Sequence, residues 1–347
     1  MKVFLLKRKS SAKLTETDPR ASASSSLSSS ASSCSRKVFV LLALTIQNTA
    51  LVLITKFSYR KSARHYHIST VIVFAEVIKL ALSYVLLVTS ESHNVANEAL
   101  RAVPANASRL GIPSMLYVVQ NNLIFEGVRL LSPTCYMVCS QSKILTSALF
   151  SVLLLKSQIS RKQYKALVLL MCGMVMVQYS EQNQTLHFQD ARNAHIGETL
   201  RGMLVVFTAA LTSGFTGAYL EKVYKTCDTI ERSIWYRNLQ LGCFSLLVAL
   251  LAMIWRDREL LQMQGVFQGY NSIVLTIILL QAIGGLIVAA VLRYAGNVLK
   301  CFAVSISICN CTVATAFLSD KNQIVNITGI IGIAVVIGST FMYSNLV

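Results

Sequence analysis

Apolar runs of about 20 residues recur along this chain, separated by short polar connections. Each run is close to the ~20 residues that an α-helix needs to cross the hydrocarbon core of a bilayer. The runs lie at residues 38–57, 68–88, 110–130, 133–154, 163–179, 199–222, 234–255, 271–292, 295–318 and 325–346. The pattern therefore predicts an all-α polytopic membrane protein with ten transmembrane helices.

The runs divide into two groups of five, at residues 38–180 and 199–347, joined by a predicted luminal loop at 181–198. The halves echo each other weakly, because each carries a Gln, a Tyr and a Lys in the same order: Gln120, Tyr136 and Lys143, then Gln281, Tyr294 and Lys300. Five is odd, so a duplication would place the halves in opposite orientations. Inverted repeats are common in secondary transporters, whose substrate site lies where the repeats meet. We therefore expect two inverted five-helix repeats.

Composition and charge agree with a membrane protein. Hydrophobic residues make up 54% of the chain and charged residues only 14%, whereas a soluble domain carries about 25% charged residues. The 32 Lys and Arg outnumber the 15 Asp and Glu, which gives a net charge of +17. The basic residues lie mostly between apolar runs, so they indicate topology and lipid headgroups rather than nucleic acid.

The distribution of Lys and Arg predicts that both termini are cytosolic. Residues 1–37 are basic and then serine-rich, a composition expected of a disordered cytosolic tail. In this orientation the glycosylation sequon at Asn183 falls in the luminal loop and the sequon at Asn106 on the cytosolic side.

The sequence offers no metal, cofactor or catalytic site. Its nine cysteines have neither CxxC nor His-paired spacing, and there is no glycine-rich phosphate loop of a nucleotide-hydrolysing domain. Glu76, Glu126 and Glu221 are isolated from one another, so they supply no pair of catalytic carboxylates. Any transport is thus facilitated or exchange-coupled. An intramembrane enzyme or receptor stays open as an alternative.

A lysine in the middle of an apolar run is the clearest candidate for function. Lys143 shares one predicted helical face with Tyr136, Ser140 and Ser147. A lysine at the centre of a spanning helix costs roughly 2.5–3.5 kcal/mol, so we expect it to face a protein interior or a water-filled cavity. A structural ion pair is the alternative, although the run contains no acidic residue.

Lys300 mirrors Lys143 in the second half, on one face with Asn297, Ser307 and Cys311. It lies near a helix end, where its side chain can instead extend to the interface. Two inward cations on related helices would suit a polyanionic ligand, especially a phosphate.

Two further sets of polar residues lie inside predicted spans. Tyr117 and Asn121 share a face and are suited either to ribose and base edges or to interhelical hydrogen bonds. Glu76 and Lys79 are three residues apart and are expected to neutralise each other.

Several stretches resemble the nucleotide-sugar transporter family, whose members are Golgi and endoplasmic reticulum antiporters of the drug/metabolite transporter superfamily. These stretches are "VQNNL" at 119–123, "KILTSALFSVLLL" at 143–155, "SGFTGAYLEKVYK" at 213–225, "SIWYRNLQLG" at 233–242, "FQGYN" at 267–271 and "RYAGNVLKCFAVSISI" at 293–308. The resemblance implies that the chain is no enzyme and needs no cofactor.

The resemblance also implies roles for individual residues. Carried over by motif, Lys143 and Lys300 would bind phosphate. Ribose and phosphate would be held by Tyr117, Asn121 and Tyr136. The base would be approached by Ser213 and Asn238.

The chain looks closest to the UDP-galactose and UDP-N-acetylglucosamine transporters. Gly242 follows "RNLQL" where the CMP-sialic acid branch tends to place an aromatic residue, which favours uracil. The family's "QVTYQLK" reads here as "MVCSQSK", and its "KYADNILKG" reads as "RYAGNVLKC". We expect exchange of cytosolic UDP-sugar for luminal UMP by alternating access in the Golgi membrane. The alternatives are CMP-sialic acid or another nucleotide sugar as substrate, and the endoplasmic reticulum as location.

Overall fold

The described part of the protein is helical throughout. A computed structural model describes residues 19–61, 66–104, 107–131, 133–185, 196–225, 233–318 and 327–344. The helices are α1 (Pro19–Lys61), α2 (Ile68–Ser90), α3 (His93–Arg101), α4 (Ala107–Leu130), α5 (Pro133–Ser140), α6 (Ser142–Leu155), α7 (Arg161–Thr185), α8 (Ile196–Lys225), α9 (Ile234–Gln264), α10 (Ser272–Tyr294), α11 (Asn297–Leu318) and α12 (Ile327–Ser344). Over these ranges the structure contains no strand, which confirms the all-α class.

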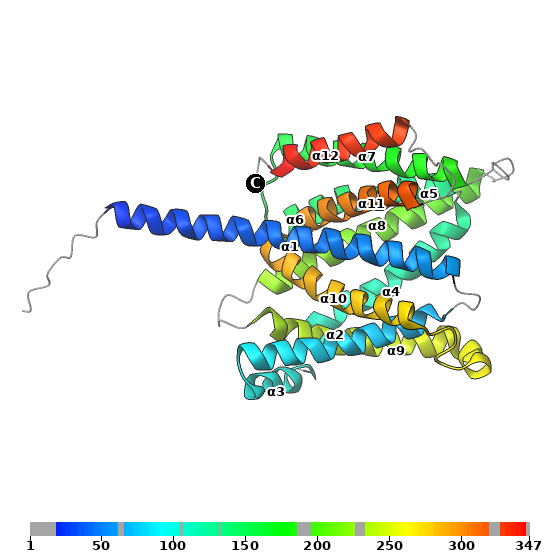
Figure 1. The fold of residues 1–347 in the computed structure, drawn as a ribbon, viewed down its shortest axis with the longest axis horizontal. Helices are drawn as coiled ribbons and strands as arrows, with labels where there is room; N and C mark the ends of the chain where they lie inside the picture. Colours follow the sequence, from blue (N-terminus) through cyan, green and yellow to red (C-terminus); the bar gives the residue numbers. More distant parts are fainter. Residues whose placement is uncertain are drawn as a thin grey trace, which may run out of the picture.

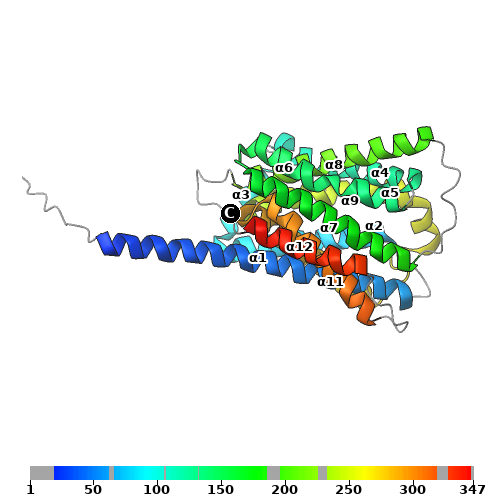
Figure 2. The ribbon, with the colours of Figure 1, turned by 90° about the horizontal axis from the view of Figure 1, so that it is seen from above.

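The long helices lie side by side in one bundle. In the view of Figure 1, α7 and α12 form one edge, while α2 and α9, with the short helix α3, form the opposite edge. Between these edges, α8 packs against α4, α5, α6, α10 and α11. Figure 2 shows the same bundle turned by 90°, with α1 and the C-terminus entering from the same end.

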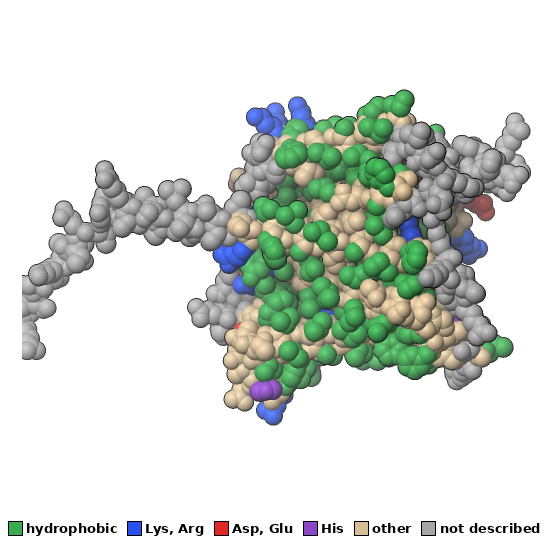
Figure 3. Space-filling model, viewed as in Figure 1, with side chains coloured by type: hydrophobic (Ala, Val, Ile, Leu, Met, Phe, Trp, Pro, Cys, Tyr) green, Lys and Arg blue, Asp and Glu red, His purple; other side chains and the backbone are tan. Residues whose placement is uncertain are grey.

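The outside of the bundle is suited to lipid. Hydrophobic side chains cover the middle of the face seen in Figure 3, and Lys and Arg side chains gather mostly towards the helix ends. Among the described residues, seven helical stretches are long and apolar enough to cross a membrane, and Ile327–Tyr343 forms a shorter apolar helix. The polytopic membrane class follows from these stretches, whereas ten crossings remain a prediction.

The N-terminal segment differs from the expected tail. Helix α1 begins at Pro19, so residues 19–37 are helical where we expected disorder over residues 1–37. Ala and Ser permit helical backbone, and the apolar run that follows continues the same helix without a break. Residues 1–18, Asn106 and most of the expected luminal loop, at 186–195, lie outside the described residues.

The fourth predicted span, residues 133–154, corresponds to α5 and α6, which are separated only by Gln141. The backbone of Gln141 stays in the αR region, with φ −69° and ψ −17°, and Cys135–Leu155 forms one stretch long enough to cross a membrane. The N–H of Ile144 donates to the carbonyl of Gln141, three residues back, at 3.0 Å. The buried Gln141 side chain donates through Nε2 to Oε1 of Gln178 in α7 at 2.7 Å. This bond ties the junction of α5 and α6 to a neighbouring helix.

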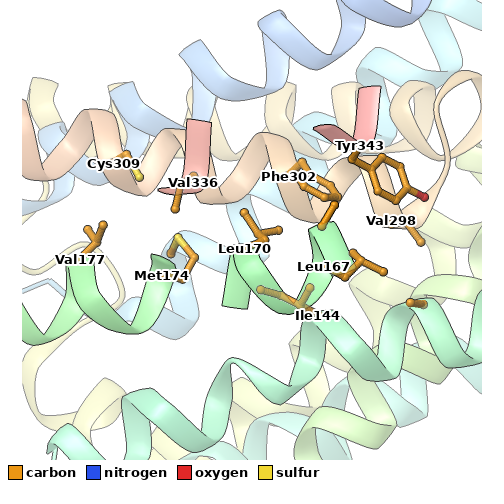
Figure 4. Close-up of a cluster of buried hydrophobic side chains, with 12 residues drawn as sticks. Ile144, Leu167, Leu170, Met174, Val177, Val298, Phe302, Cys309, Val336 and Tyr343 are labelled. Atoms are coloured by element: carbon orange, nitrogen blue, oxygen red, sulfur yellow. The ribbon is translucent and has the colours of Figure 1, made fainter. Parts of the chain in front are cut away.

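The largest hydrophobic cluster joins α6, α7, α11 and α12. Its members include Ile144, Leu170, Phe302 and Tyr343, and Figure 4 shows them converging from these helices. The Phe302 and Tyr343 rings lie 4.7 Å apart between centroids. Because residues next to both Lys143 and Lys300 belong to this cluster, its packing fixes the helices that carry the two lysines.

Candidate functional site

Lys143 and Lys300 lie on helices that share the core cluster just described. Lys143 is the second residue of α6 and is exposed, while the next residue, Ile144, is buried in the cluster. Lys300 is half-buried in the first turn of α11, between Val298 and Phe302 of the same cluster. Helices α6 and α11 pack against each other, so the two lysines lie on neighbouring helices. Two like charges in such an arrangement would be stabilised by an anion between them.

The predicted polar stripe around Lys143 crosses the junction of α5 and α6. Tyr136 and Ser140 belong to α5, whereas Lys143 and Ser147 belong to α6. The Ser140 hydroxyl donates to the carbonyl of Met137 at 2.9 Å. Ser147 is buried where α6 meets α8, and Lys143 is exposed. Lys143 and Ser147 thus differ in exposure although they lie about one turn apart on the same helix.

Helix α8 approaches α6 closely beside Lys143. A Cβ built on Gly214 would lie 2.6 Å from the backbone carbon of Thr146, so only glycine fits there without a shift. The Thr146 hydroxyl donates to the carbonyl of Ala210 at 2.7 Å and fastens the two helices. Ser213, the neighbour of Gly214, is half-buried on α8. This contact brings the helix of Ser213 against the helix of Lys143.

Tyr117 and Asn121 lie on α4 and are both exposed. Tyr136 on α5 is half-buried and faces α4, since a Cβ built on Gly127 would lie 3.7 Å from its ring. The predicted ion pair of Glu76 and Lys79 in α2 is confirmed. Glu76 also acts electrostatically on Tyr117. The exposed Tyr117 therefore lies within range of a charged pair inside the bundle.

Asn238 differs from the other candidates because its side chain is already engaged. It is buried in α9, its Nδ2 donates to the Ser83 hydroxyl at 2.8 Å, and its Oδ1 accepts from the Tyr224 hydroxyl at 3.0 Å. The amide thereby ties α2, α8 and α9 together. One N–H of Nδ2 remains for a ligand, because an amide nitrogen carries two donors.

Sequence reasoning missed the arrangement of Glu221 and Gln141. Glu221, on α8, accepts through Oε2 from the N–H of Asn297, 76 residues away, at 2.7 Å. Gln141 bonds Gln178, 37 residues away. Neither pair follows a helical spacing, so the sequence held no local signal of either contact.

The described residues include no group of three or more His, Cys, Asp or Glu side chains that would hold a metal ion. The chemistry that this region offers is instead that of two cations, exposed hydroxyl and amide groups, and a buried carboxylate. Such a set is suited to an anionic, hydrogen-bonding solute, and it pairs no nucleophile with an adjacent base.

Comparison with known proteins agrees with that chemistry. A solved crystal structure has the same fold, with a TM-score of 0.64 and 12% sequence identity over 90% of this chain and 97% of that chain. The chain is 36% identical, over 89% of its length and 93% of the relative's, to a UDP-N-acetylglucosamine/UDP-N-acetylgalactosamine transporter of Caenorhabditis elegans. It is 36% identical to a human UDP-N-acetylglucosamine transporter, over 86% of this chain and 92% of that protein.

A UDP-galactose transporter of Schizosaccharomyces pombe is 38% identical, over 89% of this chain and 87% of that protein. The family described as nucleotide-sugar transporter matches residues 32–344. This family consists of transporters, in agreement with our expectation that the chain is no enzyme. With its helical bundle, its intramembrane lysines and relatives of this similarity over most of their length, the chain belongs to the nucleotide-sugar transporter family.

Proposed function

We propose that this protein exchanges a cytosolic UDP-sugar for luminal UMP by alternating access. The observation that carries the proposal is that Lys143 and Lys300 lie on α6 and α11, two helices that pack together and share one hydrophobic cluster. A pyrophosphate or monophosphate between them would replace their repulsion by two attractive, charge-assisted hydrogen bonds. Membership of a transporter family supports movement of that ligand across the membrane.

We further propose ten crossings in two inverted repeats, with α1, α2, α4, the pair α5 and α6, and α7 matching α8 to α12 in order. The packing supports this assignment, because the helix pairs occur as exchanged partners. Helix α4 packs on α8 as α10 packs on α1, and α6 packs on α8 as α11 packs on α1. The self-matched pairs, α7 with α12 and α2 with α9, also pack directly. A bundle of this kind can rock one half against the other around a central site.

The remaining candidate residues are proposed to hold the rest of the nucleotide. Tyr117, Asn121 and Tyr136 would bind ribose and phosphate, and their exposed or half-buried side chains on α4 and α5 suit this role. Ser213 and Asn238 would approach the base. Both bound states would use the same two lysines, so the ligands compete for one site and are exchanged.

UDP-N-acetylglucosamine and UDP-galactose are the proposed substrates. The C. elegans and human relatives are named as UDP-N-acetylglucosamine transporters, the former also for UDP-N-acetylgalactosamine, and the S. pombe relative is named as a UDP-galactose transporter. We place the carrier in the Golgi membrane with both termini in the cytosol. Helix α1 enters the bundle from the end at which α12 finishes, which supports an even number of crossings (Figure 1).

A substrate panel tests this function directly. The purified protein is reconstituted into liposomes loaded with UMP, and uptake of labelled UDP-N-acetylglucosamine, UDP-galactose, CMP-sialic acid and a guanine nucleotide sugar is measured. We expect uptake of the UDP-sugars only, and only into loaded liposomes. Preferential uptake of CMP-sialic acid would overturn the uracil assignment, and equal uptake into empty liposomes would overturn exchange.

A further inference from the structure

A buried carboxylate closes the N-terminus of α11. Glu221 is 5% exposed, and its Oε2 accepts from the N–H of Asn297 at 2.7 Å. The turn before α11 is made by Gly296, whose φ of +94° favours glycine, and a Cβ built there would lie 2.7 Å from Oε1 of Glu221. The first N–H groups of a helix attract anions. The anion at this helix end is the Glu221 carboxylate.

Lys300 lies one turn into the same helix. Its backbone N–H donates to the carbonyl of Gly296 at 3.2 Å, which is the first i to i−4 hydrogen bond of α11. The Glu221 carboxylate, bonded to the Asn297 N–H, and the Lys300 side chain therefore both lie at the first turn of α11, which brings opposite charges to one helix end. The ion pair that Glu221 makes is with Lys225, at 2.5 Å, and the Lys225 side chain is 44% exposed. Since solvent screens an exposed charge, Lys225 neutralises Glu221 only in part.

Asn297 adds a second observation at this junction. Its side chain is 1% exposed, and both Oδ1 and Nδ2 lack a hydrogen-bond partner among the described residues. The amide packs against Gly217 of α8, where a built Cβ would lie 2.4 Å from Oδ1. A buried amide without partners is unfavourable, so it favours any arrangement that supplies them. The hydrogen bond from the Asn297 N–H to Glu221 thus stabilises the contact between α8 and α11, whereas the buried Asn297 side chain without partners destabilises it.

We propose that Glu221 is a built-in counter-anion for Lys300 that holds α11 against α8 while the site is empty, and that the ligand phosphate competes with it. The inference rests on the proposed function, in which Lys300 binds phosphate. A phosphate at Lys300 places a second negative charge beside Glu221 and weakens the attraction between the carboxylate and the lysine. Part of the binding free energy is then used to loosen α11 from α8, and the Asn297 amide becomes available to the ligand.

The proposal predicts opposite effects on binding and on turnover. Glu221→Gln keeps a carbonyl oxygen that accepts from the Asn297 N–H but removes the competing charge. We expect this variant to bind UMP and UDP-sugars about 3–10-fold more tightly than the wild type, because the phosphate no longer competes with an internal anion. We expect its maximal exchange rate to fall by a similar factor, because the ligand is released more slowly.

The matched controls separate this effect from a general loss of charge or packing. Glu126→Gln removes a carboxylate that pairs with Arg129 and Arg201 outside this junction, and Lys225→Met removes the exposed partner of Glu221. Both are expected to change UMP affinity less than 2-fold. Glu221→Asp, which keeps the charge, should bind UMP more weakly than Glu221→Gln does.

Binding is measured by titration of detergent-solubilised protein with UMP, and turnover by exchange in liposomes. If the wild type binds none of the nucleotides, the proposed function fails. If the wild type binds UMP but Glu221→Gln binds it equally or less tightly, the counter-anion fails while the function stands.

If Glu221→Gln is less stable than the wild type, the interaction between Glu221 and Lys300 can be tested from melting temperatures alone, without any ligand. Removing one member of a buried charge pair leaves the other uncompensated, so removing both costs less than the two single losses predict. We expect the double variant Glu221→Gln, Lys300→Met to melt at a higher temperature than the sum of the two single shifts predicts. Additive shifts would overturn the proposal.

Discussion

The decisive residues are polar groups placed inside an apolar bundle. Lys143 can be recognised as a candidate from the sequence alone, because a charged lysine within a membrane-spanning run costs free energy and is therefore rare without a functional role. The engagement of Asn238 cannot, since its partner Ser83 lies 155 residues away and on another helix. Glu221 is likewise silent in the sequence, because its contact with Asn297 exists only once α8 and α11 pack. A candidate residue could thus be recognised from the sequence where placing it in an apolar run costs free energy. The contacts between distant residues could not be recognised.

Asn238 gives a prediction at this scale, because its amide both ties three helices and is proposed to approach the base. Replacing it by Ala removes the ligand contact and leaves the Ser83 and Tyr224 hydroxyls without this partner. We expect Asn238→Ala to weaken UMP binding about 10-fold, the equivalent of roughly one lost hydrogen bond of 1.4 kcal/mol. Titration of the folded protein with UMP measures it.

Ser83→Ala is the control for that prediction. It removes the hydroxyl that Nδ2 of Asn238 binds while leaving the amide itself in place. We expect a lower melting temperature and a change in UMP affinity of less than about 2-fold. Equal losses of affinity in the two variants would show that Asn238 acts only as a tie between helices.

Single helices were well predicted where hydrophobicity alone decides them. The run at 271–292 corresponds to α10 (Ser272–Tyr294), and the short "RYAG" connection corresponds to the turn at Gly296. The bond from Gln141 to Gln178 in α7 was not predicted, because the two residues lie 37 positions apart in the sequence. Hydrophobic periodicity predicts which face of a helix is buried, but it does not predict hydrogen bonds between side chains of different helices.

The tie at Gln141 can be tested through Gln178. Gln178→Leu removes the acceptor of the buried Gln141 amide, whereas Gln178→Glu retains one. We expect Gln178→Leu to lower the free energy of unfolding by about 1–3 kcal/mol, and to weaken UMP binding because the junction beside Lys143 loses its anchor. Thermal melting and UMP titration measure the two effects. Equal behaviour of the Leu and Glu variants would show that the bond does not hold the junction.

The approach of α8 to α6 gives a second prediction for the helices. Gly214→Ala forces a methyl group to within 2.6 Å of the Thr146 backbone, so we expect a loss of about 1–3 kcal/mol in unfolding free energy. Gly197→Ala on the same helix meets nothing within 4 Å. This control should be neutral or slightly stabilising. Similar melting temperatures for the two variants would contradict the close contact.

The whole molecule combines two halves whose helix pairs correspond to each other. The odd number of apolar runs in each half led to the expectation of inverted repeats, and the exchanged packing of α4 on α8 and α10 on α1 is what such repeats require. The direct packing of α7 on α12 was beyond the sequence, because two apolar helices separated by most of the second half carry no signal of contact.

The most direct measurement is exchange of UDP-sugar for UMP in liposomes by Lys143→Ala and Lys300→Ala, with Lys165→Ala, an exposed lysine of α7, as control. Each folded site variant should exchange at less than about a tenth of the wild-type rate in both directions, because each lost charge-assisted bond is worth about 1.5–3 kcal/mol. Lys165→Ala should exchange normally. Wild-type exchange by either folded site variant would contradict the binding of phosphate between the two lysines.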